Sequence, residues 1–428
     1  MSKTAVIVGL GSNIEPLKNL RAAVSELKKV SYFNLKKISS IYESDAQVLE
    51  NSDQKTQKKY LNAAVFIEIE NFDALECLCI LKSIEKKLGR INTEKWAPRE
   101  IDLDILYVEN FKLETNELTI PHKQFTARPF ALLPALDVFE GLKIELPLWS
   151  KKWFEKKPFN TKKSVQFFWP QFVGILNVTT DSFSDGNQFL NEKTFKAQAA
   201  KLIAAGADIL DIGAESTRPE ASAITAEFEF EKLNLALSWL KEMNLATKIS
   251  IDCRNDDVLQ KVLSLHHIDY LNDVTGFDNP NMLQILKQTK IPAVVMHSLT
   301  IPPNQNNILK VTESPSVQLF NWFKNKLEIF EKNDINLNRI IFDPGIGFGK
   351  SPKQNSHILN HLDELSEIKN DFYLGFSRKS YLNQFTDAKA CERDLASAIQ
   401  LVQINPLYCQ YLRTHDIESQ KTALKIAT

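Results

Sequence analysis

The sequence predicts two domains: a ferredoxin-like α+β domain followed by an α/β domain that forms a (β/α)8 TIM barrel. The first observation is length, because 428 residues exceed what one ordinary hydrophobic core accommodates. The second is the order of strand-like and helix-like segments over residues 1–150, which is βαββαβ. The third is a rhythm of eight short apolar runs, separated by helix-like segments, over the later residues.

The N-terminal domain is predicted to span residues 1–150. Alternating or continuous apolar runs mark its strands, and apolar residues at helical spacing mark its helices. We expect strands over 5–13, 35–44, 60–70 and 101–108, and helices over 15–29 and 73–88. The stretch GLGSN (9–13) is weak evidence for a nucleotide site, because it lacks the third glycine of a dinucleotide-binding loop.

The C-terminal domain is predicted to span residues 164–428. Near-continuous apolar strands between helices are typical of parallel strands that are covered on both faces. The eight predicted strands cover 172–178, 207–213, 247–253, 268–274, 291–297, 339–345, 371–376 and 410–416. Each run ends in polar residues, and a barrel places its active site at that end of its strands. Carboxylates and amides together with Arg and Lys suit a heterocycle with ring N–H groups and an anionic group.

A lysine-rich segment separates the two domains. Residues 151–163 (KKWFEKKPFNTKK) carry six lysines, one acid and a proline. This composition is typical of a solvated linker, and an anion-binding patch is the alternative. We expect the linker only to tether the domains.

Composition excludes several classes of function. The net charge of −1 gives no general attraction to nucleic acid, and no apolar run approaches the length of a membrane span. Five scattered cysteines without metal-ligand spacing indicate reduced thiols in a cytoplasmic protein.

Residues 99–108 (REIDLDILYV) place three acids in what otherwise looks like a core strand. Because side chains alternate along a strand, Glu100, Asp102 and Asp104 share one face. A half-buried strand with a polar face would have this pattern. Two carboxylates two residues apart also suit Mg²⁺, which binds a few carboxylates together with substrate phosphates. The pattern alone leaves both interpretations open.

Segments spread over the barrel resemble dihydropteroate synthase. They are GILNVTTDSFSDG (174–186), ADILDIGAESTRP (207–219), ISIDC (249–253), NDV (272–274), FDPGIGFGK (342–350), GFSRKS (375–380) and LRTHD (412–416). That family condenses 6-hydroxymethyl-7,8-dihydropterin pyrophosphate with p-aminobenzoate, giving 7,8-dihydropteroate and pyrophosphate. The resemblance also implies that sulfonamides compete with p-aminobenzoate.

The resemblance implies a role for particular barrel residues. The pterin would be bound by Asp252, Asn272, Met296, Asp343 and Lys379, the pyrophosphate by Arg218, Arg413 and His415, and p-aminobenzoate by Thr217, Pro219 and Ser377. Asn177 would help to bind Mg²⁺ on the leaving pyrophosphate. No nucleophilic side chain is needed, because Mg²⁺ and cationic groups such as Arg218 promote departure of pyrophosphate. Asp252 and Lys379 are the other catalytic candidates.

Three departures from this family's pattern affect loops. Thr180 replaces a usual proline, Glu220 replaces a usual glycine, and residues 296–300 lack the usual continuation after MH. None of them removes a predicted pterin or pyrophosphate residue. The segment GIGFGKS (345–351) is similar to a Walker A phosphate loop, but it has three residues between Gly345 and Gly349 where that motif needs four. We therefore expect no Walker A site.

Segments of the N-terminal domain resemble 6-hydroxymethyl-7,8-dihydropterin pyrophosphokinase. They are GSN (11–13), YLNAAV (60–65), LGR (88–90), KWAPREIDLDI (95–105) and TIPHKQFTARPF (119–130). The resemblance favours the metal interpretation: Asp102 and Asp104 would bind two Mg²⁺ that bridge the phosphates of ATP. The pterin hydroxymethyl oxygen would attack the β-phosphorus of ATP, and AMP would leave.

The pyrophosphokinase resemblance also implies the remaining site residues. The pterin would be bound by Tyr60, Asn62, Trp96 and Phe130, and ATP by Arg90, His122 and Arg128, while Arg99 would act with Trp96 in a closing loop. Core packing of the aromatic residues and surface positions for lone arginines are the alternatives. The loop over 90–96 lacks a second arginine usual in the family, and the segment 45–59 lacks its usual prolines.

Together the two resemblances predict a bifunctional cytoplasmic enzyme of folate biosynthesis, whose first domain makes the ester that the second consumes. Its partners would be ATP, hydroxymethyldihydropterin, the pterin pyrophosphate and p-aminobenzoate, and its cofactor Mg²⁺. One alternative is a pterin-dependent methyltransferase barrel, against which the segments ESTRP and GFSRKS argue. The other is that one half is a non-catalytic binding module. A homodimer through the barrel is left open.

Overall fold

The computed structural model describes residues 3–45, 59–90, 98–139, 161–163, 170–178, 191–215, 224–304 and 306–427. The chain divides into two compact units, residues 1–168 and residues 169–427. Within the described residues, no helix has both the length and the apolar character that crossing a membrane requires.

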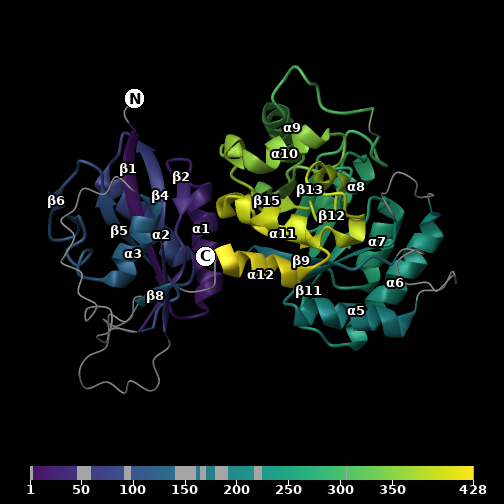
Figure 1. The fold of residues 1–428 in the computed structure, drawn as a ribbon, viewed down its shortest axis with the longest axis horizontal. Helices are drawn as coiled ribbons and strands as arrows, with labels where there is room; N and C mark the ends of the chain where they lie inside the picture. The colour runs from purple at the N-terminus through teal and green to yellow at the C-terminus, as the bar shows by residue number, and fades with distance from the viewer. Residues whose placement is uncertain are drawn as a thin grey trace. The chain divides into compact units, whose positions relative to one another are not determined.

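An antiparallel sheet with the strand order β5-β1-β4-β3-β8 forms the first unit, and β2 pairs with β4 (Figure 1). Its strands are β1 (Lys3–Ser12), β2 (Asn34–Ile38), β3 (Tyr42–Ser44), β4 (Tyr60–Glu70), β5 (Asp102–Val108) and β8 (Thr161–Lys163), with a separate pair β6 (Leu113–Glu114) and β7 (Thr119–Ile120). The helices are α1 (Pro16–Lys29), α2 (Ala74–Lys87) and α3 (Pro129–Val138). The predicted ferredoxin-like order is confirmed.

The predicted strand over 35–44 is instead two strands, β2 and β3. Polar groups between them take over backbone hydrogen bonds. The Ser39 hydroxyl accepts from the backbone N–H of Ala64 on β4 at 2.8 Å, and the Ser40 N–H donates to the Asp137 carboxylate at 3.2 Å. Such side-chain bonds to the backbone compete with the ladder, so the strand is interrupted at the two serines.

Residues 161–163, which the sequence analysis assigns to the linker, form β8. This strand pairs antiparallel with β3, in the register Thr161 with Ser44 and Lys163 with Tyr42. The end of the lysine-rich segment therefore extends the first sheet. The rest of that segment lies outside the described residues.

Helix α3 covers one face of the first sheet. Its Leu132 and Ala135 pack with Ile7 of β1, Ala64 of β4 and Leu106 of β5 in one buried cluster. Because side chains alternate along a strand, Leu106 shares its face of β5 with Asp102 and Asp104. The two acids therefore lie on the face that α3 partly covers.

The second unit is a closed parallel barrel in the order β10-β11-β12-β13-β14-β15-β16-β9, surrounded by helices (Figure 1). Its strands are β9 (Gln171–Ile175), β10 (Ile209–Gly213), β11 (Lys248–Asp252), β12 (Tyr270–Asp273), β13 (Ala293–Met296), β14 (Ile340–Asp343), β15 (Asp371–Leu374) and β16 (Tyr411–Thr414). The helices that follow these strands in turn are α5 (Glu192–Ala204), α6 (Ala226–Glu242), α7 (Asp256–Leu265), α8 (Pro280–Gln288), α9 (Pro315–Lys332), α10 (Pro352–Asn360), α11 (Asp394–Gln403) and α12 (Ile417–Ala427). The predicted TIM barrel is confirmed.

Layers of inward-facing side chains fill the barrel. One layer is mainly aliphatic and aromatic and consists of Val173, Ile209, Tyr270, Val294, Ile341, Tyr373 and Tyr411. Because a strand returns to the same face every second residue, the next inward layer toward the carboxyl ends includes Asp211, Asn272, Met296, Asp343 and Arg413. A strand period of two thus places a polar layer directly above a hydrophobic floor.

Candidate functional sites

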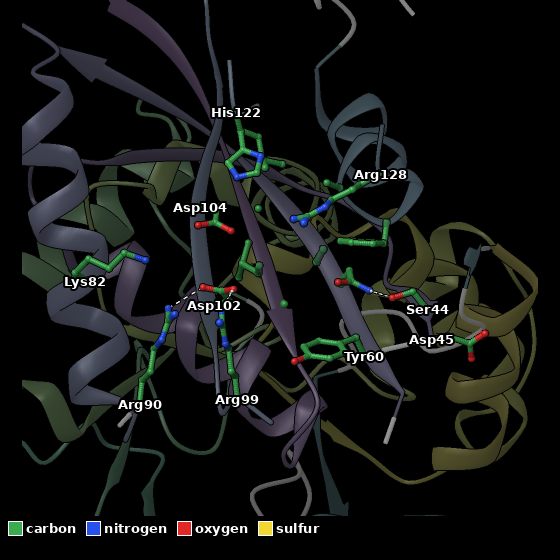
Figure 2. Close-up of a pocket in the computed structure, with 18 residues that line it drawn as sticks. Ser44, Asp45, Tyr60, Lys82, Arg90, Arg99, Asp102, Asp104, His122 and Arg128 are labelled. Atoms are coloured by element: carbon green, nitrogen blue, oxygen red, sulfur yellow. Dashed lines mark hydrogen bonds and ion pairs between the residues drawn. The ribbon is translucent and has the colours of Figure 1, made fainter. Parts of the chain in front are cut away.

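A pocket of about 360 Å³ opens on the face of the first sheet that carries Asp102 and Asp104. Side chains from β1, β4, β5, α2 and the segment leading into α3 line it (Figure 2). It brings together every described residue that the sequence predicts for this domain: Tyr60, Asn62, Arg90, Arg99, Asp102, Asp104, His122, Arg128 and Phe130. The remaining predicted residue, Trp96, lies outside the described residues.

The two aspartates have different surroundings. Asp102 accepts hydrogen bonds from Arg90 at 2.7 Å and from Arg99 at 2.6 Å. Burial raises the pKa of Asp102, but these guanidinium groups outweigh it and hold the pKa below its ordinary value. Burial and the charge of Asp102 raise the pKa of Asp104 to about 6. No side chain of the described residues forms a hydrogen bond or ion pair with Asp104.

Two glycines on β1 lie beside these acids: the Leu106 side chain fills the space at Gly9, whereas the space at Gly11 is open. In the sheet register, Gly11 stands between Asn62 on β4 and Asp102 on β5, and Gly9 stands opposite Asp104. A Cβ atom at Gly11 would lie 3.4 Å from Oδ1 of Asn62. A row of amide, glycine and carboxylate therefore forms a flat slot across three strands, with the Tyr60 ring at its edge (Figure 2).

Buried hydrogen bonds orient the walls of this slot. The side-chain amide of Asn62 donates to the Tyr42 carbonyl at 3.2 Å and to the Ser44 hydroxyl at 2.9 Å, which leaves its Oδ1 beside Gly11. Asn13 exchanges two hydrogen bonds with the backbone of Arg99, at 2.8 and 3.2 Å. Asn13 of the GSN segment (11–13) thus holds the backbone of Arg99, just before β5, next to the pocket.

In the barrel, Arg413 links two carboxylates at the carboxyl ends of the strands. Its Nε donates to Asp211 at 2.6 Å and its terminal nitrogen to Asp252 at 2.9 Å. Asp211 also accepts from Ser250 at 2.6 Å and from Asn272 at 3.2 Å. Burial raises the pKa of Asp252 to about 7, although Arg413 opposes the shift.

Lys379 and Asp343 lie in the same barrel mouth, together with Met296. The ammonium of Lys379 donates to the Ile346 carbonyl and lies 4.6 Å from the centre of the Phe348 ring. Burial lowers the pKa of Lys379 to about 8, and burial raises that of Asp343. Met296 packs with Val274 and Phe348 in a buried cluster. These side chains could hold the polar edge of a flat heterocycle.

The structure places the other predicted barrel residues as follows. Ser377 lies beside His415, with its hydroxyl 3.1 Å from the ring Nδ1. Asn177 lies just beyond β9 and is half-buried. The predicted p-aminobenzoate residues Thr217 and Pro219, the predicted pyrophosphate residue Arg218, and the departures Thr180 and Glu220 lie outside the described residues.

Both units match known protein families. Residues 7–140 match the 7,8-dihydro-6-hydroxymethylpterin-pyrophosphokinase family, and residues 173–415 match the pterin binding enzyme family. A folate synthesis bifunctional protein of Chlamydia muridarum is 32% identical over 441 residues, covering 99% of this chain and 97% of that protein. The chain belongs to the bifunctional folate-synthesis family.

Solved structures agree with this assignment for the barrel of the folate-synthesis chain. A Yersinia pestis dihydropteroate synthase in complex with a sulfonamide drug is similar with a TM-score of 0.55 and 30% identity, covering 60% of this chain and 93% of that one. The Anaplasma phagocytophilum enzyme with bound 6-hydroxymethylpterin-monophosphate is similar with a TM-score of 0.54 and 30% identity, covering 60% and 98%. The folate-synthesis chain therefore carries a pyrophosphokinase domain and a dihydropteroate synthase domain. Neither the methyltransferase nor the non-catalytic alternative is favoured.

Sequence reasoning missed Lys82, which lines the pyrophosphokinase pocket, and Glu85, which supports Lys82 and Arg90 from α2. Lys82 on α2 lines the pocket, and its ammonium donates to Glu85 at 2.9 Å (Figure 2). Glu85 is buried, forms an ion pair with Arg90, and accepts from the backbone N–H of Leu103 at 2.7 Å. The sequence feature that could have revealed them is the spacing of three residues between Lys82 and Glu85, which places both on one face of α2.

The donor set of the pyrophosphokinase pocket fits Mg²⁺. Asp104 is a buried carboxylate whose pKa is raised by burial and by a like charge, and a cation would compensate both effects. Among the described residues no cluster of three or more His, Cys, Asp or Glu side chains could hold a metal. Mg²⁺ binds through one or two carboxylates plus substrate phosphates, so Asp102 and Asp104 suffice only together with a phosphate ligand.

In the synthase domain, sequence reasoning counted Asp211 among the polar strand ends of the active-site face but gave it no binding role, and it did not single out Ser250. Both are buried, and both lie in the polar layer of the barrel. The strand period of two could have placed Asp211 in this layer, because it follows the inward-facing Ile209 by two residues.

Proposed function

We propose that the flat slot formed by Asn62, Gly11 and Asp102 binds the pterin of 6-hydroxymethyl-7,8-dihydropterin. The side-chain oxygen of the buried Asn62, beside Gly11, supplies a hydrogen-bond acceptor, and the aromatic rings of Tyr60 and Phe130 stack on the heterocycle. Trp96 would be a further contact of the pterin, as the pyrophosphokinase resemblance implies. The absence of a side chain at Gly11 supports this placement, because a ring can lie flat against the strand there.

The cationic side of the pocket is proposed to bind ATP. Arg90, Arg99, His122 and Arg128 surround the two aspartates and are suited to the triphosphate. Two Mg²⁺ held by Asp102 and Asp104 would neutralise charge on the reacting phosphates. The pterin hydroxymethyl oxygen loses its proton to solvent and forms a bond to the β-phosphorus of ATP, the bond from that phosphorus to the oxygen of the α-phosphate breaks, and AMP leaves.

In the barrel, we propose that the pterin pyrophosphate lies above the hydrophobic floor. Asp252, Asn272, Asp343 and Lys379 bind the pterin edge, and Met296 contacts its face. Arg413 is already held by Asp211 and Asp252, so it presents a fixed positive charge at the mouth of the barrel. By the same proposal, His415 and Arg218 would bind the pyrophosphate, and Asn177 would help to hold Mg²⁺ there.

The second reaction is a substitution at the pterin methylene. Cationic groups at the mouth stabilise pyrophosphate as its bond to the methylene carbon breaks. The amino nitrogen of p-aminobenzoate, in a site formed by Thr217, Pro219 and Ser377, forms the new bond and loses a proton. The observation that carries this assignment is the hydrogen-bonded chain Asp252–Arg413–Asp211–Asn272, which is a polar set directly above an apolar layer.

A coupled assay tests both assignments. Purified protein is incubated with ATP, Mg²⁺, hydroxymethyldihydropterin and p-aminobenzoate, and AMP and dihydropteroate are measured. We expect both products, no AMP without the pterin, and dihydropteroate without ATP when pterin pyrophosphate is supplied. Absence of AMP in the complete mixture would refute the pyrophosphokinase assignment, and absence of dihydropteroate from supplied pterin pyrophosphate would refute that of the synthase.

We further propose that the enzyme works in the cytoplasm. Its five cysteines are not joined in disulfides, as expected in a reducing compartment. Fractionation of cells that contain the tagged protein tests this location. A homodimer through the barrel stays a prediction, which analytical ultracentrifugation of the purified chain would test.

A further inference from the structure

The side chain of Lys350, at the end of the GIGFGK segment, turns into the protein and is only 6% exposed. Its Nζ lies 2.9 Å from Nδ1 of His297, 2.9 Å from the Gly345 carbonyl and 2.9 Å from the Phe348 carbonyl. An ammonium group has three N–H donors, so these contacts use all of them. The lysine of this loop has no donor left for a phosphate group, unlike the lysine of a Walker A loop.

The imidazole of His297 anchors this ammonium to β13. His297 is 3% exposed and its ring lies edge-on to Trp322, with 5.1 Å between centres. Burial and the charge of Lys350 lower the pKa of His297, so the ring is neutral and Nδ1 can accept a hydrogen bond. At Gly345, where φ is +64°, a Cβ atom would lie 1.9 Å from the His297 carbonyl oxygen. Residues 345–350 therefore contact His297 twice, through the backbone at Gly345 and through the ammonium of Lys350.

The other side of the same loop contacts Lys379. The Ile346 carbonyl accepts from its ammonium, and the Phe348 ring lies 4.6 Å from its Nζ. Between them, a Cβ atom at Gly347 would lie 3.2 Å from Cδ of Lys379. Ile346, Gly347 and Phe348 therefore all contact or approach Lys379. The carbonyls that accept hydrogen bonds from Lys350 belong to Gly345, just before these three residues, and to Phe348, the last of them.

We propose that Lys350 is a positioning residue of the synthase site: anchored on His297, it holds the loop 345–349 in the shape that places Lys379 against the pterin. This inference rests on the proposed role of Lys379 in pterin binding. Lys350 itself contacts only protein groups in the structure, so it acts through the loop. The loop also bonds to the pterin-binding carboxylate, since the N–H of Gly345 donates to Asp343 at 2.7 Å.

The experiment replaces Lys350 by methionine in the full-length protein. Lys350→Met keeps most of the side-chain volume and removes the three donors. The matched control is Lys353→Met, at an exposed position on α10. We expect Lys350→Met to raise the KM for pterin pyrophosphate about tenfold and to leave the KM for p-aminobenzoate within twofold. AMP formation by the other domain and both KM values of Lys353→Met should stay at wild-type levels.

A double-mutant cycle separates positioning of Lys379 from a general structural role. If Lys350 acts through Lys379, then kcat/KM of the double variant Lys350→Met/Lys379→Met should equal that of Lys379→Met alone within twofold. A further tenfold loss in the double variant, equal rises in both KM values, or wild-type kinetics of Lys350→Met would overturn the inference. Wild-type activity of Lys379→Met would instead overturn the proposed function of Lys379.

A second pair of variants applies if Lys350→Met does not fold. His297→Phe keeps a ring against Trp322 and removes the acceptor for the ammonium, whereas His297→Asn keeps an acceptor oxygen near the position of Nδ1. We expect the raised KM for pterin pyrophosphate in His297→Phe and a smaller rise in His297→Asn. Wild-type kinetics of a folded His297→Phe, or the reverse order of the two variants, would also overturn the inference.

Discussion

Asp102 and Asp104 extend from one face of β5 into one pocket, but among the described side chains only Asp102 is paired, with two arginines. The pair therefore combines a carboxylate that the protein holds ionised with one that lacks a positive partner. Asp104 is the natural position for an added cation, and Asp102 is the position already tied into the fold.

This asymmetry predicts different stabilities for two variants with the same loss of activity. Asp102→Asn and Asp104→Asn should each lower AMP formation at least a hundredfold, because a neutral amide is a poor Mg²⁺ ligand. Asp102→Asn should also lower the free energy of unfolding by about 1–3 kcal/mol, since it removes the charged partner of the half-buried Arg99 guanidinium and leaves Arg90 paired with Glu85 alone. Asp104→Asn should be at least as stable as the wild type. Urea unfolding in EDTA measures stability; wild-type AMP formation in both variants would exclude the metal assignment.

The flat slot predicts selective damage from a side chain at Gly11. Gly11→Val should raise the KM for hydroxymethyldihydropterin at least tenfold and change the KM for ATP less than threefold, because the new methyl groups fill the space between Asn62 and Asp102. The backbone at Gly11 is extended and a Cβ atom meets no atom closer than 3.4 Å, so thermal stability should not fall. An unchanged pterin KM would show that the heterocycle binds elsewhere.

Loss of a polar partner in the barrel should affect one reaction only. Asp252→Ala or Lys379→Ala should lower dihydropteroate formation at least a hundredfold, to a rate that is still measurable, and leave AMP formation intact. Removing Asp252 leaves one donor of Arg413 without its partner at a cost of about 1–3 kcal/mol, and removing Lys379 leaves the pterin edge unpaired. Calorimetry with pterin checks the binding step, and unchanged affinity in both variants would argue against this pocket.

The buried ammonium of Lys350 predicts a pH dependence of barrel stability. Burial lowers the pKa of Lys350 to about 7, whereas an unfolded lysine titrates near 10.4. Between these values the folded state binds fewer protons than the unfolded state, so the free energy of unfolding rises as pH increases from about 7 to 10. Lys350→Met should lose this rise, because methionine has no group that titrates. Urea titrations at three pH values compare the variant with Lys353→Met, and parallel curves for all three proteins would contradict the prediction.

Two separately expressed fragments of the chain test whether the linker only tethers the domains. Because β8 belongs to the first sheet, the proposed separable pieces are residues 1–168 and 169–428 instead of 1–150 and 164–428. Each should keep near-native specific activity. The fragment 1–150 should unfold at lower temperature than 1–168, because it lacks the strand that pairs with β3. An inactive fragment 169–428 would show that the first domain supports the barrel.

Sequence reasoning predicts a strand well where the residues of that strand alone show the alternation or apolar composition of a strand. The acids at 102 and 104 and the eight barrel strands follow from periodicity and local composition. The pairing and register between strands cannot be predicted from the residues of any single strand. The open space at Gly11 can be recognised only from its pairing with Asn62 on β4 and Asp102 on β5. Strand β8 forms by pairing with β3, which residues 161–163 alone do not reveal. The buried contacts of Lys350 likewise depend on His297, which is 53 residues away in the sequence.

The closure of the barrel has a consequence for synthesis of the chain. Strand β16 pairs with β9, and Arg413 on β16 aligns with Val173 on β9. The barrel therefore cannot close, nor Arg413 reach Asp211, before residues 411–414 have left the ribosome. Domains fold as units during translation, the N-terminal one first. A nascent chain would thus gain its pyrophosphokinase pocket while its synthase half is still an open array of unpaired strand edges, the stage at which chaperones would be needed most.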